Sequence, residues 1–221
     1  MTLPKADVEA AYQTHATRYD LALRLYGLIG LRIREYRARA IALLSLKAGD
    51  HVVDLGCGTG LSFEQLLQSI GPDGRITGVD ISAEMLRCAS ARVQRAQMKN
   101  VELVRADVAE YVFPRDVSGV LSTGVFGYVS ERDAVIERIA RDLMPGGHVA
   151  IVDGKRPEAW PAWLFRAFVR VSRPFGVTEG YFEARTWESL QRWFARTTFE
   201  SVYGGLLYIA SGSNPPMIEC R

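Results

Sequence analysis

The chain has 221 residues, of which 48% are hydrophobic and 24% are charged. A chain of this size and composition buries enough apolar surface for a single domain over residues 1–221, and it is too apolar to be intrinsically disordered. The formal net charge of +2 excludes the strongly basic surface that is typical of nucleic-acid-binding proteins, so no nucleic-acid partner is expected.

The start of the chain is expected to form a helical lid over residues 1–46. Its helical part is predicted over Leu21–Leu46, with an interruption near Gly27 or Gly30. The first ten residues lack the apolar run of a secretory signal, and no stretch is long and apolar enough to span a membrane. These features predict a cytoplasmic protein.

Residues 47–154 alternate short β-branched runs with helical stretches, which is typical of a parallel sheet with helices on both faces. Turn-forming glycine and proline clusters separate the elements. The expected strands are His51–Leu55, Arg75–Val79, Val101–Arg105, Val117–Ser122 and His148–Asp153, and the expected helices are Leu61–Ile70, Ala83–Gln97 and Glu131–Leu143.

Residues 155–205 hold 12 of the 22 aromatic residues and all four tryptophans, which predicts a cap over the substrate. Within this cap, apolar residues from Trp160 to Val171 follow helical spacing, beside a stripe of Arg166, Arg170 and Arg173. The stripe leaves three alternatives open: a helix that covers the sheet edge, a substrate lid, or a helix on a membrane surface.

The last segment, residues 198–212, is expected to form an antiparallel hairpin. The runs Phe199–Tyr203 and Leu206–Ser211 flank Gly204-Gly205, which is a two-residue hairpin signal. The chain therefore has the pattern of an α/β fold: a doubly wound, mostly parallel sheet of seven strands that ends in an antiparallel hairpin.

A glycine-rich motif, Val53-Asp54-Leu55-Gly56-Cys57-Gly58-Thr59-Gly60, closes the first strand and opens a helix. Glycines there let the backbone approach a ligand closely at a helix N-terminus. The motif lacks the third glycine spacing of G-x-G-x-x-G, which counts against a dehydrogenase. Asp80 ends the second strand, where a carboxylate can accept both ribose hydroxyls, and Asp107 follows the third.

Together these motifs resemble the class I S-adenosylmethionine-dependent methyltransferases over about residues 45–155, including the turn Pro145-Gly146-Gly147. The resemblance implies S-adenosylmethionine as cofactor and a Rossmann-like fold. It assigns the methionine part, the ribose and the adenine of the cofactor to the ends of the first three strands. The cofactor-binding residues that it implies are Asp54, Gly56, Cys57, Gly58, Gly60, Asp80, Ile81, Asp107, Val108 and Ser122.

Ligands of an open parallel sheet lie beyond the carboxyl ends of its strands, which selects Tyr128 and Asp153 as catalytic candidates. His15 and Tyr19 on the N-terminal segment are two further candidates. Tyr19-Asp20 resembles the start of quinone and phospholipid methyltransferases. The Arg-Asn pair of the quinone enzymes is missing near Tyr128, which counts against a quinone acceptor.

The leading interpretation is a methyltransferase for a small or lipid-like acceptor, with N-methylation of an amine as the first hypothesis. A natural-product acceptor is nearly as well supported. The alternative is a non-catalytic S-adenosylmethionine-binding sensor or partner subunit, since fold does not establish chemistry. The three cysteines and three histidines have no ligand spacing, so no metal is expected. Peripheral membrane contact stays open, and the sequence does not predict an oligomeric state.

Overall fold

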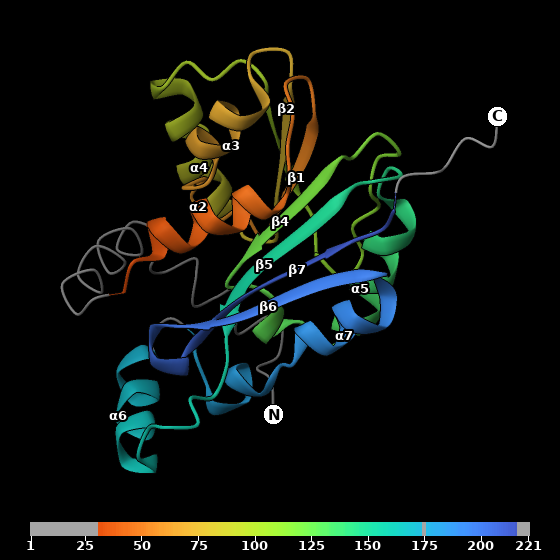
Figure 1. Cartoon of the computed structure of the whole chain (residues 1–221). Coiled ribbons are helices and arrows are strands. Elements are labelled where there is room, and N and C mark those ends of the chain that lie inside the picture. The colour runs from red at the N-terminus through yellow and green to blue at the C-terminus, as the bar shows by residue number, and fades with distance from the viewer. Residues whose placement is uncertain (1–30, 174–175, 216–221) are drawn as a thin grey trace.

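A computed structural model describes residues 31–173 and 176–215 and contains one sheet with the strand order β3-β2-β1-β4-β5-β7-β6. Strands β1 to β5 run parallel to one another, whereas β7 is antiparallel to both β5 and β6. The predicted fold class is confirmed (Figure 1). The strands are β1 (His51–Leu55), β2 (Arg75–Asp80), β3 (Val101–Arg105), β4 (Gly119–Thr123), β5 (His148–Gly154), β6 (Arg196–Val202) and β7 (Leu207–Ser213).

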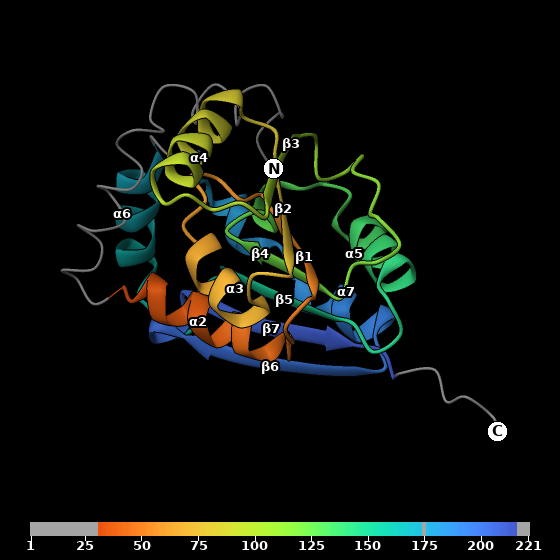
Figure 2. The same ribbon diagram turned by 90° about the horizontal axis from the view of Figure 1, so that it is seen from above.

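Helices cover both faces of the sheet. One hydrophobic core joins α2, α3 and α4 to one face, and a second joins α5 and α7 to the other. Figure 2 shows the first group to the left of the strands and the second to the right. The helices are α2 (Ile33–Leu43), α3 (Phe63–Ile70), α4 (Ala83–Arg95), α5 (Arg132–Asp142), α6 (Ala162–Ser172) and α7 (Thr186–Trp193), with short 3-10 turns η1 (Phe126–Tyr128), η3 (Glu179–Glu183) and η4 (Tyr203–Gly205).

Local sequence explains the elements that frame the site. All five residues of β1 are buried, as expected for a central parallel strand. Helix α4 begins at Ser82, whose side chain accepts a hydrogen bond from the backbone N–H of Met85 (3.3 Å). Its first turn carries Glu84, and its last turn carries two arginines, which complements the helix dipole. The chain therefore leaves β2 and enters α4 in a fixed geometry.

Several predicted boundaries differ from the structure, most clearly near the two ends of the described chain. Residues 31–46 of the predicted helix 21–46 lie within the described residues, and only Ile33–Leu43 of them is helical, as α2. The final hairpin begins earlier than expected, at Arg196, so β6 overlaps the predicted cap. Its connection is longer than the expected two-residue turn: it comprises Tyr203, Gly204 and Gly205, which all adopt positive φ.

Candidate active site

The glycine loop after β1 is tied to the end of β2. The backbone N–H groups of Gly56 and Cys57 both donate to the Val79 carbonyl oxygen (2.7 and 2.9 Å). A Cβ on Gly56, which has a φ of 72°, would lie 2.2 Å from a Val125 methyl group, so this position requires glycine for close packing against the loop after β4. Cys57 is buried, and burial raises the pKa of its thiol. Cys57 therefore packs in the core and offers no thiolate.

Gly58 differs from the other two glycines of the loop. A Cβ on Gly60 would lie 2.5 Å from the ring of Phe63, whereas a Cβ on Gly58 would meet nothing within 4 Å. Both residues have positive φ, at 75° and 55°. Gly60 is thus needed for packing, and Gly58 faces open space above the strand ends, as a ligand cradle requires.

Asp54 lies under this loop as a fully buried carboxyl group. Neither of its oxygens has a hydrogen bond of ordinary geometry in the described part of the chain, although the Ser62 hydroxyl lies near it. Burial raises the pKa of Asp54 to about 7, while the nearby charge of Arg37 and the Ser62 hydroxyl lower it. An unpaired buried carboxyl needs a donor, and a cationic group such as the α-amino group of S-adenosylmethionine would supply one.

Asp80 is held in place at the end of β2. Its Oδ2 accepts a hydrogen bond from the Gly58 N–H (2.8 Å), and its Oδ1 accepts one from the Ser82 N–H (2.9 Å). Burial raises the pKa of Asp80, against these backbone donors. Each oxygen keeps a lone pair, so the fixed carboxylate fits the two ribose hydroxyls. The next residue, Ile81, is partly exposed beside it.

The end of β3 supports the predicted adenine contacts only in part. Asp107 uses one carboxylate oxygen to accept from the Ala109 N–H (2.8 Å), which shapes the turn after the strand. Val108 is 7% exposed and belongs to the core beneath α5 and α7. Little of Val108 is therefore available to a ligand in this state of the chain, and its cofactor role stays a prediction.

Ser122 lies on a different face of the sheet from Asp54. It is in register with Leu55 and Ile151, which pack under α5 and α7, whereas Asp54 is in register with Leu121 of the opposite core. Its hydroxyl is fully buried and has no hydrogen-bond partner among the described residues. The structure does not bring Ser122 and Asp54 together, and binding of cofactor by Ser122 remains a prediction.

Asp153 is buried at the end of β5 and fully engaged. Its carboxylate accepts hydrogen bonds from the Tyr181 hydroxyl (2.5 Å) and the Gly154 N–H (2.7 Å) through Oδ1, and from the Gly127 N–H (3.3 Å) through Oδ2. Burial raises the pKa of Asp153, and these donors oppose the rise. A carboxylate so enclosed is unsuited to exchange protons with an acceptor, so the geometry favours a positioning role over the expected catalytic one.

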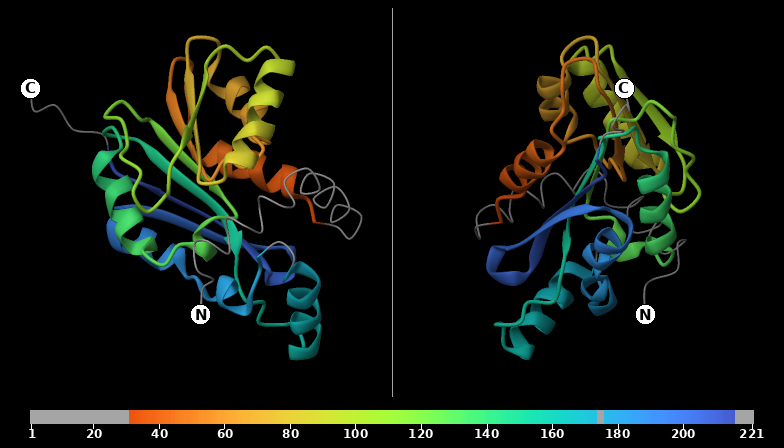
Figure 3. Two further views of the ribbon diagram at one scale, coloured as in Figure 1. Left: turned by 180° about the vertical axis from the view of Figure 1, so that it is seen from behind. Right: turned by 45° about the vertical axis from the view of Figure 1, so that its right-hand side comes forward.

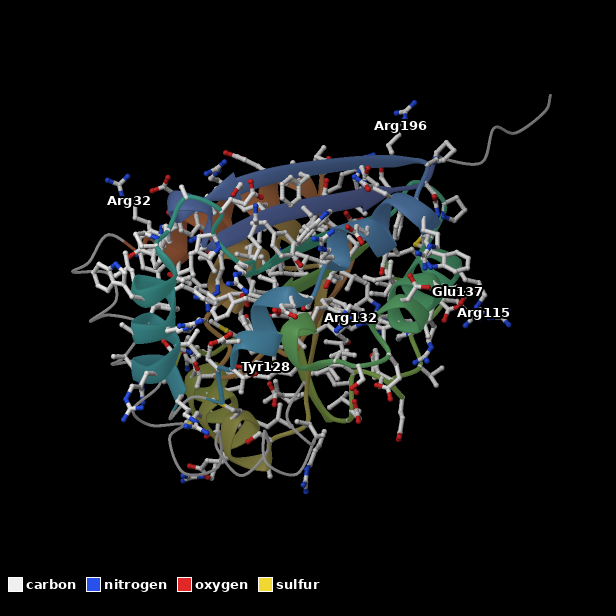
Figure 4. All side chains as sticks on the ribbon, turned by 90° about the horizontal axis from the view of Figure 1, so that it is seen from below. Arg32, Arg115, Tyr128, Arg132, Glu137 and Arg196 are labelled. Carbon is white, nitrogen blue, oxygen red and sulfur yellow. The ribbon has the colours of Figure 1, made fainter. Side chains whose placement is uncertain are left out.

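Tyr128 packs against Tyr181, the residue whose hydroxyl donates to this buried carboxylate. Its ring centroid is 4.8 Å from that of Tyr181, and it is half-buried, whereas Tyr181 is buried beneath it. Figure 4, which views the molecule from below, shows Tyr128 near the middle of this face, with Arg32 and Arg196 toward the periphery. Because η1 follows β4 directly, Tyr128 lies at the carboxyl edge where a ligand is expected.

The other two catalytic candidates, His15 and Tyr19, lie outside the described residues. Within the described residues, no three His, Cys, Asp or Glu side chains converge on a point that could hold a metal ion. No helix there is long and apolar enough to cross a membrane. The parallel register of β1, β2, β4 and β5 nevertheless brings the predicted site residues of these strands to the same side of the sheet, at the carboxyl ends of the strands.

Sequence reasoning missed three residues that shape this edge. Arg37 of α2 is buried near Asp54, and Arg92 of α4 donates through Nε to the Thr59 carbonyl oxygen (2.8 Å). Tyr181 comes from the aromatic cap. The sequence around Arg37 and Arg92 did not single them out, because each acts on a residue distant in sequence, Asp54 and Thr59. The density of aromatic residues after residue 155 indicated the region of Tyr181 without singling it out.

Comparison with known proteins agrees with this architecture. A family profile described as a methyltransferase domain matches residues 52–147. The demethylmenaquinone methyltransferases of Listeria welshimeri and Listeria monocytogenes are each 29% identical over 87% of this chain and 80% of their own length. A SAM-dependent methyltransferase structure from Aquifex aeolicus has a TM-score of 0.58 at 23% identity, over 76% of this chain and 84% of that chain.

A second structural neighbour is the Haemonchus contortus phosphoethanolamine N-methyltransferase 2 in complex with S-adenosyl-L-methionine. Its TM-score is 0.62 at 18% identity, over 80% of this chain and 52% of that chain, so the likeness concerns the fold. With the glycine loop, the profile match and these relatives together, the chain is a class I S-adenosylmethionine-dependent methyltransferase. The prediction of an enzyme that uses S-adenosylmethionine is confirmed.

Proposed function

We propose that this enzyme methylates a ring carbon of a reduced quinone that lacks that methyl group. The observation that carries the proposal is the aromatic layer beside the cofactor loop, in which half-buried Tyr128 lies on buried Tyr181 and Tyr181 packs on Phe182 (ring centroids 5.0 Å apart). A flat, neutral ring gains both apolar burial and offset stacking against such a layer. The names of the Listeria relatives support this acceptor class.

The cofactor end of the site follows from the geometry of β1 and β2. In this proposal Asp80 binds the ribose hydroxyls, Asp54 faces the α-amino group, and the backbone at Gly58 leaves space for the methionine chain. In this proposal the reactive methyl group lies near Val125, which packs on Gly56 and lies three residues before Tyr128. The acceptor ring on Tyr128 and the cofactor would then share one space above β4.

S-adenosylmethionine supplies a methyl group on a sulfonium centre whose leaving group is already activated. Transfer would form a bond between the ring carbon and the methyl carbon as the methyl–sulfur bond breaks, and the ring carbon would then lose its proton to solvent or a base. Alignment and exclusion of water supply much of the acceleration for such an in-line displacement. The task of Tyr128 is therefore to orient the ring, and that of Asp153 is to fix η1, which carries Tyr128.

A reduced quinone becomes a better carbon nucleophile when a ring hydroxyl loses its proton. The carboxylate of Asp153 is a poor base for that proton because three donors already occupy it. His15 remains the base that the sequence predicts, and Tyr19 remains a second candidate on the same segment. Both roles are predictions about residues outside the described part of the chain.

N-methylation of an amine is the second candidate. The faces of Tyr128 and Tyr181 carry the negative quadrupole that attracts a cationic amine, which is the specific observation in its favour. The missing Arg-Asn pair near Tyr128 also favours it. The two candidates differ in a measurable way, because an amine acceptor is independent of redox state whereas a quinone must be reduced before its ring carbon can attack.

The test uses the full chain with radiolabelled S-adenosylmethionine and two acceptors in parallel. One acceptor is a prenylated naphthoquinone without the ring methyl group, reduced with dithionite, and the other is phosphoethanolamine. We expect label on a ring carbon of the reduced quinone, located by NMR, and none on the oxidised quinone. Label on nitrogen alone, or cofactor binding without transfer to the quinol, would overturn the proposal. Asp80→Ala provides the cofactor-deficient control.

A further inference from the structure

Helix α6 is an 11-residue element that follows β5 and packs through one side only. Phe165 and Val169 are buried on that side against Tyr181 and Phe182 of the turn η3. Figure 1 and Figure 3 show α6 at the periphery, away from the two helical layers of the sheet. The opposite side of the helix therefore faces outward.

That outward side is apolar where a solvent-facing helix is ordinarily polar. Trp163 is 70% exposed, Val171 is 67% exposed and Leu164 is 37% exposed. Trp163, the exposed Ala167 and Val171 are four residues apart and share one face of the helix, with Leu164 beside them. The described residues have six exposed large hydrophobic side chains, and this one helix carries three of them.

Three arginines flank this apolar face on one side. Arg166, Arg170 and Arg173 are spaced by four and three residues, and all are exposed. None of them forms an ion pair with a carboxylate of the described residues. By contrast, Arg185, just before α7, pairs with Glu188, and Arg192 of α7 pairs with Asp133. Helix α6 and the residue that follows it thus combine an exposed apolar face around Trp163 with three arginines that have no acidic partner among the described residues.

If α6 only covered the edge of the sheet, its buried side would be explained, but its exposed apolar and basic side would not. An anionic bilayer fits both outward features, because tryptophan prefers the headgroup boundary and arginines pair with lipid phosphates. The charge complementarity and the exposed apolar face together select this occupant over a neutral surface. A second copy of the chain would cover the apolar face but would place like-charged arginines near one another.

We propose that α6 docks this enzyme on the surface of an anionic membrane. Trp163, Leu164 and Val171 enter the headgroup boundary, and the three arginines contact lipid phosphates. The docking goes beyond the proposed methyl transfer and does not depend on the identity of the acceptor. It also brings the carboxyl edge of the sheet, next to α6, close to the lipid surface.

The experiment is co-sedimentation of the full chain with vesicles of phosphatidylglycerol and phosphatidylcholine, and with phosphatidylcholine alone. We expect binding to the anionic vesicles that weakens as salt increases. Each arginine near an anionic surface contributes about fivefold, so R166Q, R170Q and R173Q together should weaken binding on the order of 100-fold. W163S should also weaken binding, and the tryptophan emission of the wild type should shift to shorter wavelength with vesicles.

A matched variant removes the same charge elsewhere. R95Q, R115Q and R196Q change three exposed arginines that lie outside α6, two of which Figure 4 labels far from it. V112S is the matched control for W163S, because Val112 is 78% exposed on another part of the surface. Both controls should bind vesicles nearly as the wild type does. S-adenosylhomocysteine affinity, measured by calorimetry, reports that each variant is folded.

Three outcomes would overturn the docking. They are no vesicle binding at low salt, an equal loss of binding in the two arginine triples, and a lipid-free dimer that W163S dissociates. Failure of the proposed function is separate, since a protein that binds vesicles and cofactor but does not methylate a quinol keeps the docking inference intact.

Discussion

The hydroxyl of Tyr181 donates a 2.5 Å hydrogen bond to Oδ1 of Asp153, which joins the turn η3 of the aromatic cap to the end of β5. Asp153 is 2% exposed, so its carboxylate depends on protein donors in place of water. A Cβ on Gly127 would lie 2.2 Å from the Tyr181 ring, and a Cβ on Gly154 would lie 2.5 Å from it. The two glycines whose backbone N–H groups donate to Asp153 therefore also pack closely against the Tyr181 ring. In the proposed function, this one contact supports the acceptor side of the site.

Removal of the Tyr181 hydroxyl should destabilise the fold and loosen the acceptor site. Tyr181→Phe leaves Asp153 with one donor fewer, and we expect a loss of roughly 1–3 kcal/mol in the free energy of unfolding, measured by urea denaturation. KM for the acceptor should rise more than Kd for S-adenosylhomocysteine, because η1 and Tyr128 rest on this contact. Tyr111→Phe is the control, since the Tyr111 ring is buried beside Phe113 in the core under α5 and α7. Equal effects of both substitutions would contradict the assignment.

The glycine loop and the strand ends could be predicted because their signals are local. Positive φ at Gly56, Gly58 and Gly60 and the carboxylate that ends β2 each follow from a short run of sequence. The partner of Asp153 could not be predicted in this way, since Tyr181 lies 28 residues further on and arrives through cap packing. Its position at the end of a predicted strand made Asp153 a catalytic candidate, whereas its hydrogen bonds favour a positioning role.

Asp54 should make stability depend on pH. Its pKa is about 7 in the folded chain against an ordinary 3.8, so the folded form keeps a proton that the unfolded form has already lost between these values. The stabilisation is present at low pH and is lost as the pH rises toward 7. In Asp54→Asn, the fall in unfolding free energy from about pH 5 to about pH 8 should shrink by about 3 kcal/mol, measured by denaturant titration.

Two comparisons make the Asp54 prediction specific. Asp73→Asn, in the exposed turn after α3, should leave the pH dependence as in the wild type. Asp54→Asn should also weaken S-adenosylmethionine binding, because an amide cannot balance the charge of the α-amino group. If the unfolding free energy of Asp54→Asn falls with pH as steeply as that of the wild type, the pKa of Asp54 is not raised in the folded chain and the prediction is wrong.

Asp80 should carry much of the cofactor affinity. Asp80→Ala removes the acceptor for two ribose hydroxyls, and charge-assisted hydrogen bonds contribute roughly 1.5–3 kcal/mol each. We therefore expect S-adenosylhomocysteine to bind at least about tenfold more weakly, measured by isothermal titration calorimetry. The Gly58 and Ser82 N–H groups also lose their acceptor, so circular dichroism must accompany the titration. Wild-type affinity in a folded Asp80→Ala protein would remove Asp80 from the cofactor site.

The open space in front of Gly58 yields the sharpest test, because the chain holds a matched glycine outside the site. Gly58 and Gly49 both have positive φ, at 55° and 90°, and a Cβ on either would meet nothing within 4 Å. An alanine at each position therefore costs a similar backbone strain of about 1–2 kcal/mol without a clash inside the protein. Only the Cβ at position 58 would enter the space assigned to the cofactor.

Gly58→Ala should accordingly lower the affinity for S-adenosylhomocysteine by on the order of tenfold or more, whereas Gly49→Ala should leave that affinity unchanged. Both variants should lose a similar, small amount of stability in denaturant titrations, since the strain in each is local. Calorimetry on the two proteins separates the ligand effect from the strain because the strain is shared. If both alanines lower the affinity equally, the space above Gly58 is not where the cofactor binds, and the glycine serves the turn alone.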